Sequence, residues 1–281
     1  MLAVGRFAEL SGPELGRLAP GAVVVQPVGA IEHHGPHLPL ATDAIVAEAV
    51  ADAAALARAD LSLLVLPVLS YALSSEHLWA PGTVSLSPTT LLGVLDDLGA
   101  SLARAGVARL VFLNGHGGNS ALLRVACREI RVRHGLLTFL AHPNLPVDQG
   151  GTASKGDTSL SVHAGAGETS VLAYLRPDLV HLDRAERCLP EWLAGYEQVG
   201  FGKEVTFGWT SEDLSPLGVI GDPTLASPEA GRELFERSTE RFADALGEIA
   251  RFSFPDGPAS PGHPGLAAGG TIDKGIERPC V

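Results

Sequence analysis

The sequence predicts an α/β fold built on a parallel sheet with crossover helices. Two observations predict it: short apolar runs rich in Val and Leu recur along the chain, and segments with helical periodicity separate them. No linker-like composition interrupts the chain before residue 252. We therefore expect one α/β domain over residues 1–252. The remaining residues, 253–281, are rich in Pro and Gly and poor in apolar residues, which predicts a disordered tail.

The predicted elements begin with two strands and two helices. Strands are expected at residues 22–28 and 63–69, and a helix rich in Ala and Val at residues 43–57 lies between them. The second helix has explicit end signals. It begins after Ser87, a candidate N-cap that is followed by proline, and it ends before Gly106.

The alternation continues in the second half of the chain. Strands are expected at residues 110–113 and 136–141, with a helix at residues 119–134 between them. Two further helices are expected, a short one at residues 168–175 and a long one from Ser227 to about residue 252.

Residues 143–162 form a polar, Gly-rich stretch without periodicity. Stretches of this length are usually functional loops or disordered segments. Because this one leads directly into His163 and Glu168, we expect it to be an active-site loop.

The composition limits the partners and the compartment. A formal charge of −12 argues against nucleic acid or a membrane as a partner, since both need a basic footprint. The three cysteines lie far apart without CxxC spacing, as expected of free thiols. The N-terminus lacks the apolar core of a signal peptide, and no stretch approaches the ~20 apolar residues of a spanning helix. We therefore expect a cytoplasmic protein.

Residue types that bind metal ions follow two of the predicted strands. Glu32, His34 and Asp43 lie within twelve residues of one another after the first strand, and His116 follows residues 110–113. In open α/β sheets the ligand crevice lies at the carboxyl ends of the strands, so these residues are expected to meet. Glu32 and His34 differ by two positions and point to the same side of an extended segment.

Glu168, after the polar stretch, is the fifth candidate ligand. Because the candidates offer only oxygen and nitrogen, zinc, manganese or iron are the expected metals. The sequence thus predicts a metal-centred hydrolytic site that is made by residues from several strand ends. The predicted ligands are Glu32, His34, Asp43, His116 and Glu168.

The glycines around His116 also suggest an alternative, a turn that cradles a phosphate at a helix N-terminus. The dinucleotide pattern G-x-G-x-x-G fails because Ser120 stands where the third glycine belongs, and the lysine of a P-loop is missing. A phosphate- or nucleotide-binding module without metal therefore remains the alternative from another class. A third hypothesis is a structural subunit that contains metal but has no catalytic activity.

Several ordered motifs resemble the creatininase (creatinine amidohydrolase) family, and the similarity runs from about Val24 to Glu229. The motifs are Glu32-His33-His34-Gly35-Pro36-His37-Leu38-Pro39 with Asp43, Ser75-Glu76-His77, Pro81-Gly82-Thr83, Asn114-Gly115-His116-Gly117-Gly118-Asn119, His163-Ala164-Gly165 and Glu168-Thr169-Ser170. The resemblance implies a three-layer α/β/α subunit with two divalent metal ions, in a homo-oligomer that is often a hexamer.

The resemblance also implies roles for the ligands. By position, Asp43 would bridge both ions, Glu32 and His116 would complete one of them, and His34 would bind the other. Creatininase has a further carboxylate two residues after the histidine that matches His116, where this chain has glycine. Glu168 is our candidate for the missing ligand.

Three further residues are candidates for catalysis. His163 matches a histidine of the family's catalytic loop, and an unperturbed pKa of about 6.5 suits a group that protonates the departing nitrogen. The acidic residue that precedes it in creatininase is Val162 here. Glu76 and His77 are the other candidates, and they could instead orient ligands or substrate.

Together these features predict a metal-dependent amidohydrolase that cleaves the C–N bond of a small amide, cyclic amides included. Two cations lower the pKa of a shared water from about 16 toward neutrality, which makes hydroxide available. Within the family, the alternatives are a formamide deformylase and a peptidase that trims a precursor of the mycofactocin type.

Overall fold

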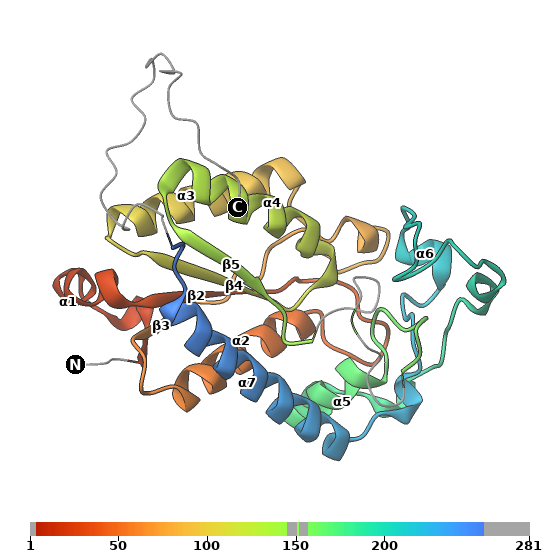
Figure 1. Ribbon diagram of the computed structural model, residues 1–281. Helices are drawn as coiled ribbons and strands as arrows, with labels where there is room; N and C mark the ends of the chain where they lie inside the picture. Colours follow the sequence, from red (N-terminus) through yellow and green to blue (C-terminus); the bar gives the residue numbers. More distant parts are fainter. Residues whose placement is uncertain (1–3, 145–150, 152–156, 256–281) are drawn as a thin grey trace, which may run out of the picture.

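Parallel strands form the central sheet of the computed structural model, which describes residues 4–144, 151 and 157–255 (Figure 1). The strands are β1 (Val4–Arg6), β2 (Val23–Val28), β3 (Leu63–Val65), β4 (Arg109–Asn114) and β5 (Leu137–Ala141). Their order across the sheet is β1-β3-β2-β4-β5, and each neighbouring pair is parallel. The longest strands, β2 and β4, are therefore neighbours, and the chain leaves both of them at the same edge.

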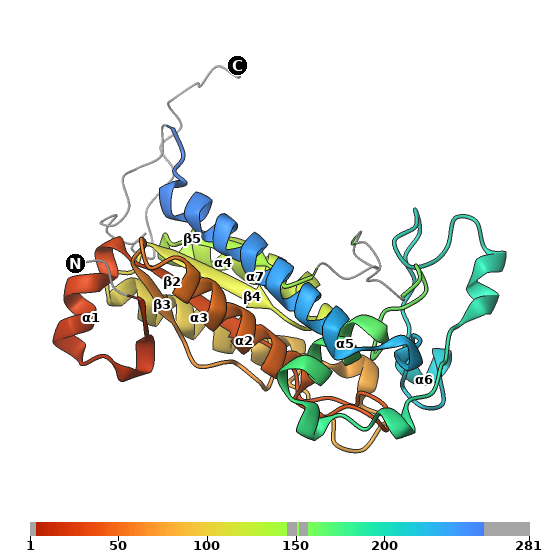
Figure 2. The same ribbon diagram turned by 90° about the horizontal axis from the view of Figure 1, so that it is seen from below.

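Helices cover both faces of the sheet. The helices are α1 (Gly12–Leu18), α2 (Thr42–Ala57), α3 (Pro88–Arg104), α4 (Ser120–His134), α5 (Ala166–Leu175), α6 (Ser211–Leu214) and α7 (Pro228–Arg251). α3 and α4 lie on one face, and α2 and α7 lie on the other (Figures 1 and 2). This arrangement confirms the three-layer α/β/α fold.

Alternating side chains of β2 supply both apolar layers of the core. Val24 packs in one cluster with Leu95 of α3, whereas Val25 packs in the other with Ala51 of α2 and Leu246 of α7. A strand that is buried on both faces reads as a continuous apolar run, which is why β2 was recognisable in the sequence.

The end signals of the second predicted helix are confirmed. Ser87 is the N-cap of α3, and its hydroxyl accepts a hydrogen bond from the Thr90 amide at 3.2 Å. Gly106, just beyond the helix, has φ +86°, a conformation that glycine adopts without strain.

The strand predicted at residues 63–69 is shorter than expected, because β3 ends at Val65. Pro67 has no backbone N–H to donate to the ladder. Pairing resumes only as an isolated bridge between Val28 and Leu69.

The sequence analysis missed β1 and α1 at the N-terminal side. α1 carries the signal that identifies it: Ser11 and Glu14 form a capping box, with the Ser11 amide donating to the Glu14 carboxylate at 2.8 Å.

The predicted loop and tail lie mostly outside the described residues. Of residues 143–162 the structure describes 143, 144, 151 and 157–162, and of the tail it describes 253–255. Across the described part of the chain, none of the helices has the length and apolarity needed to cross a membrane.

Candidate metal centre

The segments that follow β2 and β4 build the site. After β2 the chain runs through Glu32 and His34 into α2, which carries Asp43 in its first turn. After β4 it reaches His116, two residues beyond Asn114. Because β2 and β4 are parallel neighbours, residues that are far apart in the sequence meet at one edge of the sheet.

Two glycines allow α2 to approach the strand ends closely. A Cβ on Gly29 would lie 2.5 Å from the Cα of Ala44, and a Cβ on Gly115 would lie 2.6 Å from the carbonyl oxygen of Asp43. Larger residues at either position would push away the helix turn that carries Asp43.

Two asparagines hold the backbone around His116. The Asn114 side chain donates to the His116 carbonyl at 2.7 Å and accepts from the His116 amide at 3.2 Å. Asn119 donates to the Asn114 side chain at 3.2 Å and to the Gly29 carbonyl at 3.0 Å. The loops after β2 and β4 are thus tied to each other through buried amides.

Four of the predicted ligands face one another at the centre. His116 Nδ1 lies 3.2 Å from both Glu32 Oε1 and Asp43 Oδ2. His34 Nε2 lies 3.2 Å from Asp43 Oδ1 and 3.8 Å from Glu32 Oε1. Asp43 therefore stands between the two histidines, with one oxygen directed to each.

The donor atoms of this group are buried and lack partners among the described residues. Both carboxylate oxygens of Glu32, together with Asp43 Oδ2 and His34 Nε2, make no hydrogen bond. Burying charged groups without partners is costly, so native proteins pair them or use them to bind metals. Divalent cations fit this set of buried oxygen and nitrogen donors.

Glu168 joins the cluster from the start of α5. One of its oxygens accepts a hydrogen bond from the Ala164 amide at 2.6 Å. Glu168, His34 and His163 also offer ligand atoms that all lie within 4.8 Å of one another. The carboxylate is thus fixed by the backbone on one side and faces the histidines on the other.

His163 presents one particular nitrogen to the site. Its Nε2 lies 2.7 Å from the His33 carbonyl, which can only accept, so Nε2 carries the hydrogen. Nδ1 then keeps its lone pair and lies 3.7 Å from Glu32 Oε1. This nitrogen is available to take up a proton or to bind a metal ion.

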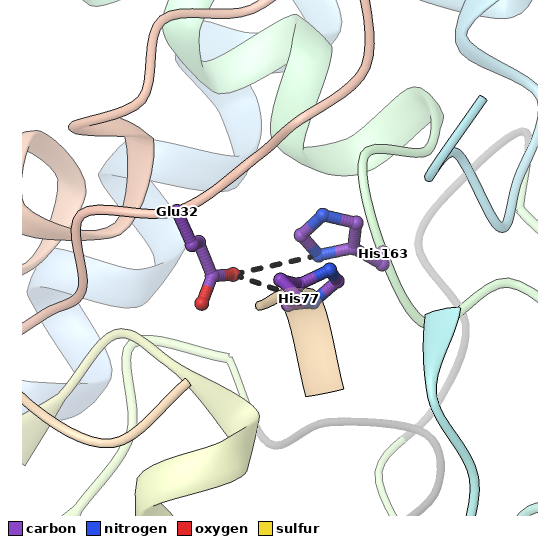
Figure 3. A group of neighbouring side chains, drawn as sticks. All are labelled: Glu32, His77 and His163. Carbon is purple, nitrogen blue, oxygen red and sulfur yellow. Dashed lines mark ion pairs between the residues drawn. The ribbon is translucent and has the colours of Figure 1, made fainter. Parts of the chain in front are cut away.

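His77, from the short 3₁₀ helix η3 (Ser75–His77), lies beside His163. The two ring centroids are 4.1 Å apart, and His77 Nε2 lies 3.7 Å from Glu32 Oε1. Figure 3 shows both imidazoles on the same side of the Glu32 carboxylate. Ligand atoms of all three residues lie within 4.8 Å of one another, so they could also hold a cation.

The close packing of like and unlike groups shifts their proton affinities. Burial lowers the pKa of His34, but the facing carboxylates of Asp43, Glu32 and Glu168 outweigh this and raise it to about 9. Burial raises the pKa of Glu168 to about 7. Burial and the neighbouring imidazoles hold the pKa of His163 well below its usual range. His163 is therefore uncharged at neutral pH.

A cavity of about 690 Å³ opens onto the cluster. Its lining includes Glu76, His77 and His163, and it also includes the aromatic residues Phe207 and Trp209, which form an aromatic wall. The described residues around it include no Lys or Arg.

The structure brings all the predicted site residues together. They are Glu32, His34, Asp43, His116 and Glu168 as ligands, and Glu76, His77 and His163 as catalytic candidates. Sequence reasoning missed Asp157, which accepts from the Ala166 and Gly167 amides at 2.9 and 2.8 Å and so caps the helix that carries Glu168. The N-cap position of α5 is Gly165, and Asp157 lies nine residues before Ala166, so no local capping pattern identifies it in the sequence.

The fold and the cluster are those of a metal-dependent amidohydrolase. A crystal structure of creatinine amidohydrolase matches with a TM-score of 0.70 and 30% identity, covering 89% of this chain and 99% of that one. A structure described as the manganese form of creatininase matches with a TM-score of 0.68 and 28% identity over the same shares of the two chains.

The family model for creatininase, described as creatinine amidohydrolase, matches residues 8–246, and the chain belongs to this family. The mycofactocin precursor peptide peptidase of Mycobacterium ulcerans is 35% identical, covering 83% of this chain and 87% of that protein. The creatinine amidohydrolase of Pseudomonas putida is 30% identical, covering 83% and 92%. The family predicted from the motifs is confirmed.

Proposed function

We propose that the chain is a metal-dependent peptidase that hydrolyses one amide bond of a short peptide of the mycofactocin precursor class. The observation that carries the proposal is the cavity of about 690 Å³ in contact with the cluster. Pockets for drug-sized ligands span about 300–1,000 Å³, so this one has room for several residues of a peptide. The identity of 35% to a peptidase of that class supports the same substrate.

The charge of the cavity supports a neutral or cationic peptide. Glu76, Asp157 and Glu168 contribute carboxyl groups to the lining, and Lys and Arg are missing from its described residues. A phosphorylated or strongly acidic substrate would find no Lys or Arg to pair with among these described lining residues.

For the metal centre we assign the ligands by the distances given above. Asp43 would be shared between two ions, because its oxygens face His116 and His34 separately. Glu32 and His116 would hold one ion, and His34 with Glu168 would hold the other. Zinc or manganese suits these donors, and solved creatininases include manganese and zinc–zinc forms.

The residues around the centre would carry out the proton transfers of the reaction. Bound divalent cations supply an acidic water and polarise the scissile carbonyl. Nδ1 of His163 accepts a proton from the attacking water, because Nε2 is held by the His33 carbonyl. The same nitrogen then protonates the departing amine, which completes the C–N cleavage.

A substrate panel tests the proposal. Purified protein is loaded with zinc or manganese and incubated with short precursor peptides, creatinine, hydantoins and formamides, and products are measured by mass spectrometry. We expect cleavage of a peptide at one position, loss of activity on chelation, and recovery when metal is restored. Turnover of creatinine without any peptide cleavage would contradict the peptidase assignment and favour the second candidate.

That second candidate is hydrolysis of a small cyclic amide, favoured by the 30% identity to creatinine amidohydrolase. The glycine at position 118 and Val162 distinguish this chain from creatininase. These two differences argue against creatinine as the substrate. The homo-oligomer and the cytoplasmic location remain predictions, which size-exclusion chromatography with light scattering and cell fractionation would check.

A further inference from the structure

The two ring nitrogens of His116 face different groups. Nδ1 faces Glu32 and Asp43, each at 3.2 Å. Nε2, on the far side of the ring, is buried and lies 3.3 Å from Glu76 Oε1. This last contact has an ion-pair distance but does not meet hydrogen-bond geometry as it stands. Glu76 is thus the carboxylate that can accept the Nε2 hydrogen.

Glu76 is held in place independently of the metal ligands. Its backbone carbonyl accepts a hydrogen bond from the Ser211 hydroxyl at 3.2 Å. The Trp79 indole in turn donates to the same hydroxyl at 2.7 Å. These contacts fix the short helix η3 to α6, so the Glu76 carboxylate approaches His116 from a separate, anchored element.

Gly118 leaves the space that the Glu76 carboxylate fills. A Cβ at this position would lie 2.1 Å from Glu76 Oε1 and 2.5 Å from His116 Nε2. Both distances are far below van der Waals contact, so a side chain at 118 would displace the carboxylate or the ring. Gly118 does not have a positive φ. Glycine is therefore required at position 118 because a side chain would not fit there, and not because of the backbone conformation.

We propose that Glu76 is the positioning residue that orients His116 for metal binding, and that it requires glycine at position 118. The inference rests on the proposed metal centre and assigns Glu76 a role outside the ligand set. A histidine that binds a metal through one nitrogen commonly donates its other N–H to a carboxylate, which fixes the ring and increases its basicity. Glu76 gives His116 such a partner and leaves Nδ1 directed at Glu32 and Asp43.

The test compares metal binding by purified variants. The variants are Glu76→Ala, Glu76→Gln, Gly118→Ala and the double variant Glu76→Ala with Gly118→Ala, with Glu212→Ala on α6 as the matched control. Metal content is measured by mass spectrometry and affinity by competition with a chromogenic chelator. The visible spectrum of the cobalt-loaded protein reports the ligand field. Circular dichroism establishes that each variant is folded.

We expect Glu76→Ala to lower the metal affinity about 10- to 100-fold and to change the cobalt spectrum. Glu76→Gln keeps an acceptor and should lose less. Gly118→Ala should weaken binding in the wild-type background and weaken it less in the Glu76→Ala background, where the clash with the carboxylate is gone and only the close approach to His116 Nε2 remains. Glu212→Ala should match the wild type.

Two outcomes overturn the inference, and they are distinguishable. Wild-type affinity and an unchanged cobalt spectrum in both Glu76 variants would show that Glu76 does not position His116, while the metal centre itself stands. Failure of the wild-type protein to bind zinc, manganese or cobalt would remove the metal centre and this role together. Were Glu76→Ala to fail to fold, the isosteric Glu76→Gln and Gly118→Ala would decide the question.

Discussion

The two halves of the site are held in different ways. Glu32, His34, Asp43 and His116 come from segments that leave β2 and β4, whose pairing runs in register over their full length. The other half, from His163 to the aromatic cavity wall, belongs to the stretch that precedes α7. The described residues of that stretch form two α-helices, α5 and the short α6, and four short 3₁₀ helices. The sheet therefore positions most of the proposed metal donors, whereas the irregular stretch contributes part of the lining of the cavity proposed for the substrate.

Removing ligands of the sheet half should have the largest effect. Glu32→Gln and Asp43→Asn each keep the side-chain size but remove a charge that faces both His34 and His116. We expect metal content to fall severely and activity to drop by about 10³-fold or more. Elemental analysis and peptide hydrolysis measure the two effects. Full metal content in both variants would show that the ligand assignment is wrong.

A change at His163 separates chemistry from metal binding. His163→Asn should lower kcat about 10²- to 10⁴-fold, because the group that accepts and returns the proton is lost. Metal content should stay near that of the wild type, since Glu32, Asp43 and the other assigned ligands remain. Loss of metal from this variant would instead make His163 a ligand, together with Glu32 and His77.

Changes in the irregular half should alter substrate binding without altering the amount of bound metal. Trp209→Ala removes an aromatic side chain from the cavity wall. We expect KM for the peptide to rise about 10-fold, as for loss of one apolar contact of 1–2 kcal/mol, with metal content unchanged. Equal loss of kcat and of bound metal would mean that the two halves are not separable.

The smallest expected effect is on folding stability, and it comes from His142, which is not among the assigned ligands. Burial, aided by the charge of Arg124, lowers the pKa of His142 to about 4, and its ring lies 2.9 Å from the Ser120 hydroxyl. Between pH 6.5 and 4 the unfolded chain binds more protons at this residue than the folded chain does. Stability from this group is therefore complete above pH 6.5 and is lost as the pH falls toward 4.

Thermal unfolding of chelated protein at pH 5 and pH 7 checks this. His142→Gln should reduce the loss of stability between the two pH values by ~1 kcal/mol, after allowance for partial exposure. An identical loss in both proteins would place the pH dependence elsewhere.

The parts of the site that follow regular elements were predictable from the sequence. Buried parallel strands read as apolar runs, so the residues directly after them could be placed at one edge before any coordinates were known. His163 and Glu168 lack such a frame: Glu168 was a candidate ligand from its residue type and its place after the polar stretch, and the role of His163 came from the family motifs. The relation between Glu76 and Gly118 was not predictable, because it depends on the distance between η3 and the loop after β4 in space. The early end of β3 depends on Pro67, whose effect on a predicted strand is local and easily underestimated.

One backbone oxygen links the two halves. The carbonyl of His33, which accepts from His163, lies between two assigned ligands in the chain, Glu32 and His34. Any displacement of that tripeptide would change the hydrogen bond that holds Nε2 of His163. The positions of the proposed base and of two assigned donors therefore depend on the same three residues.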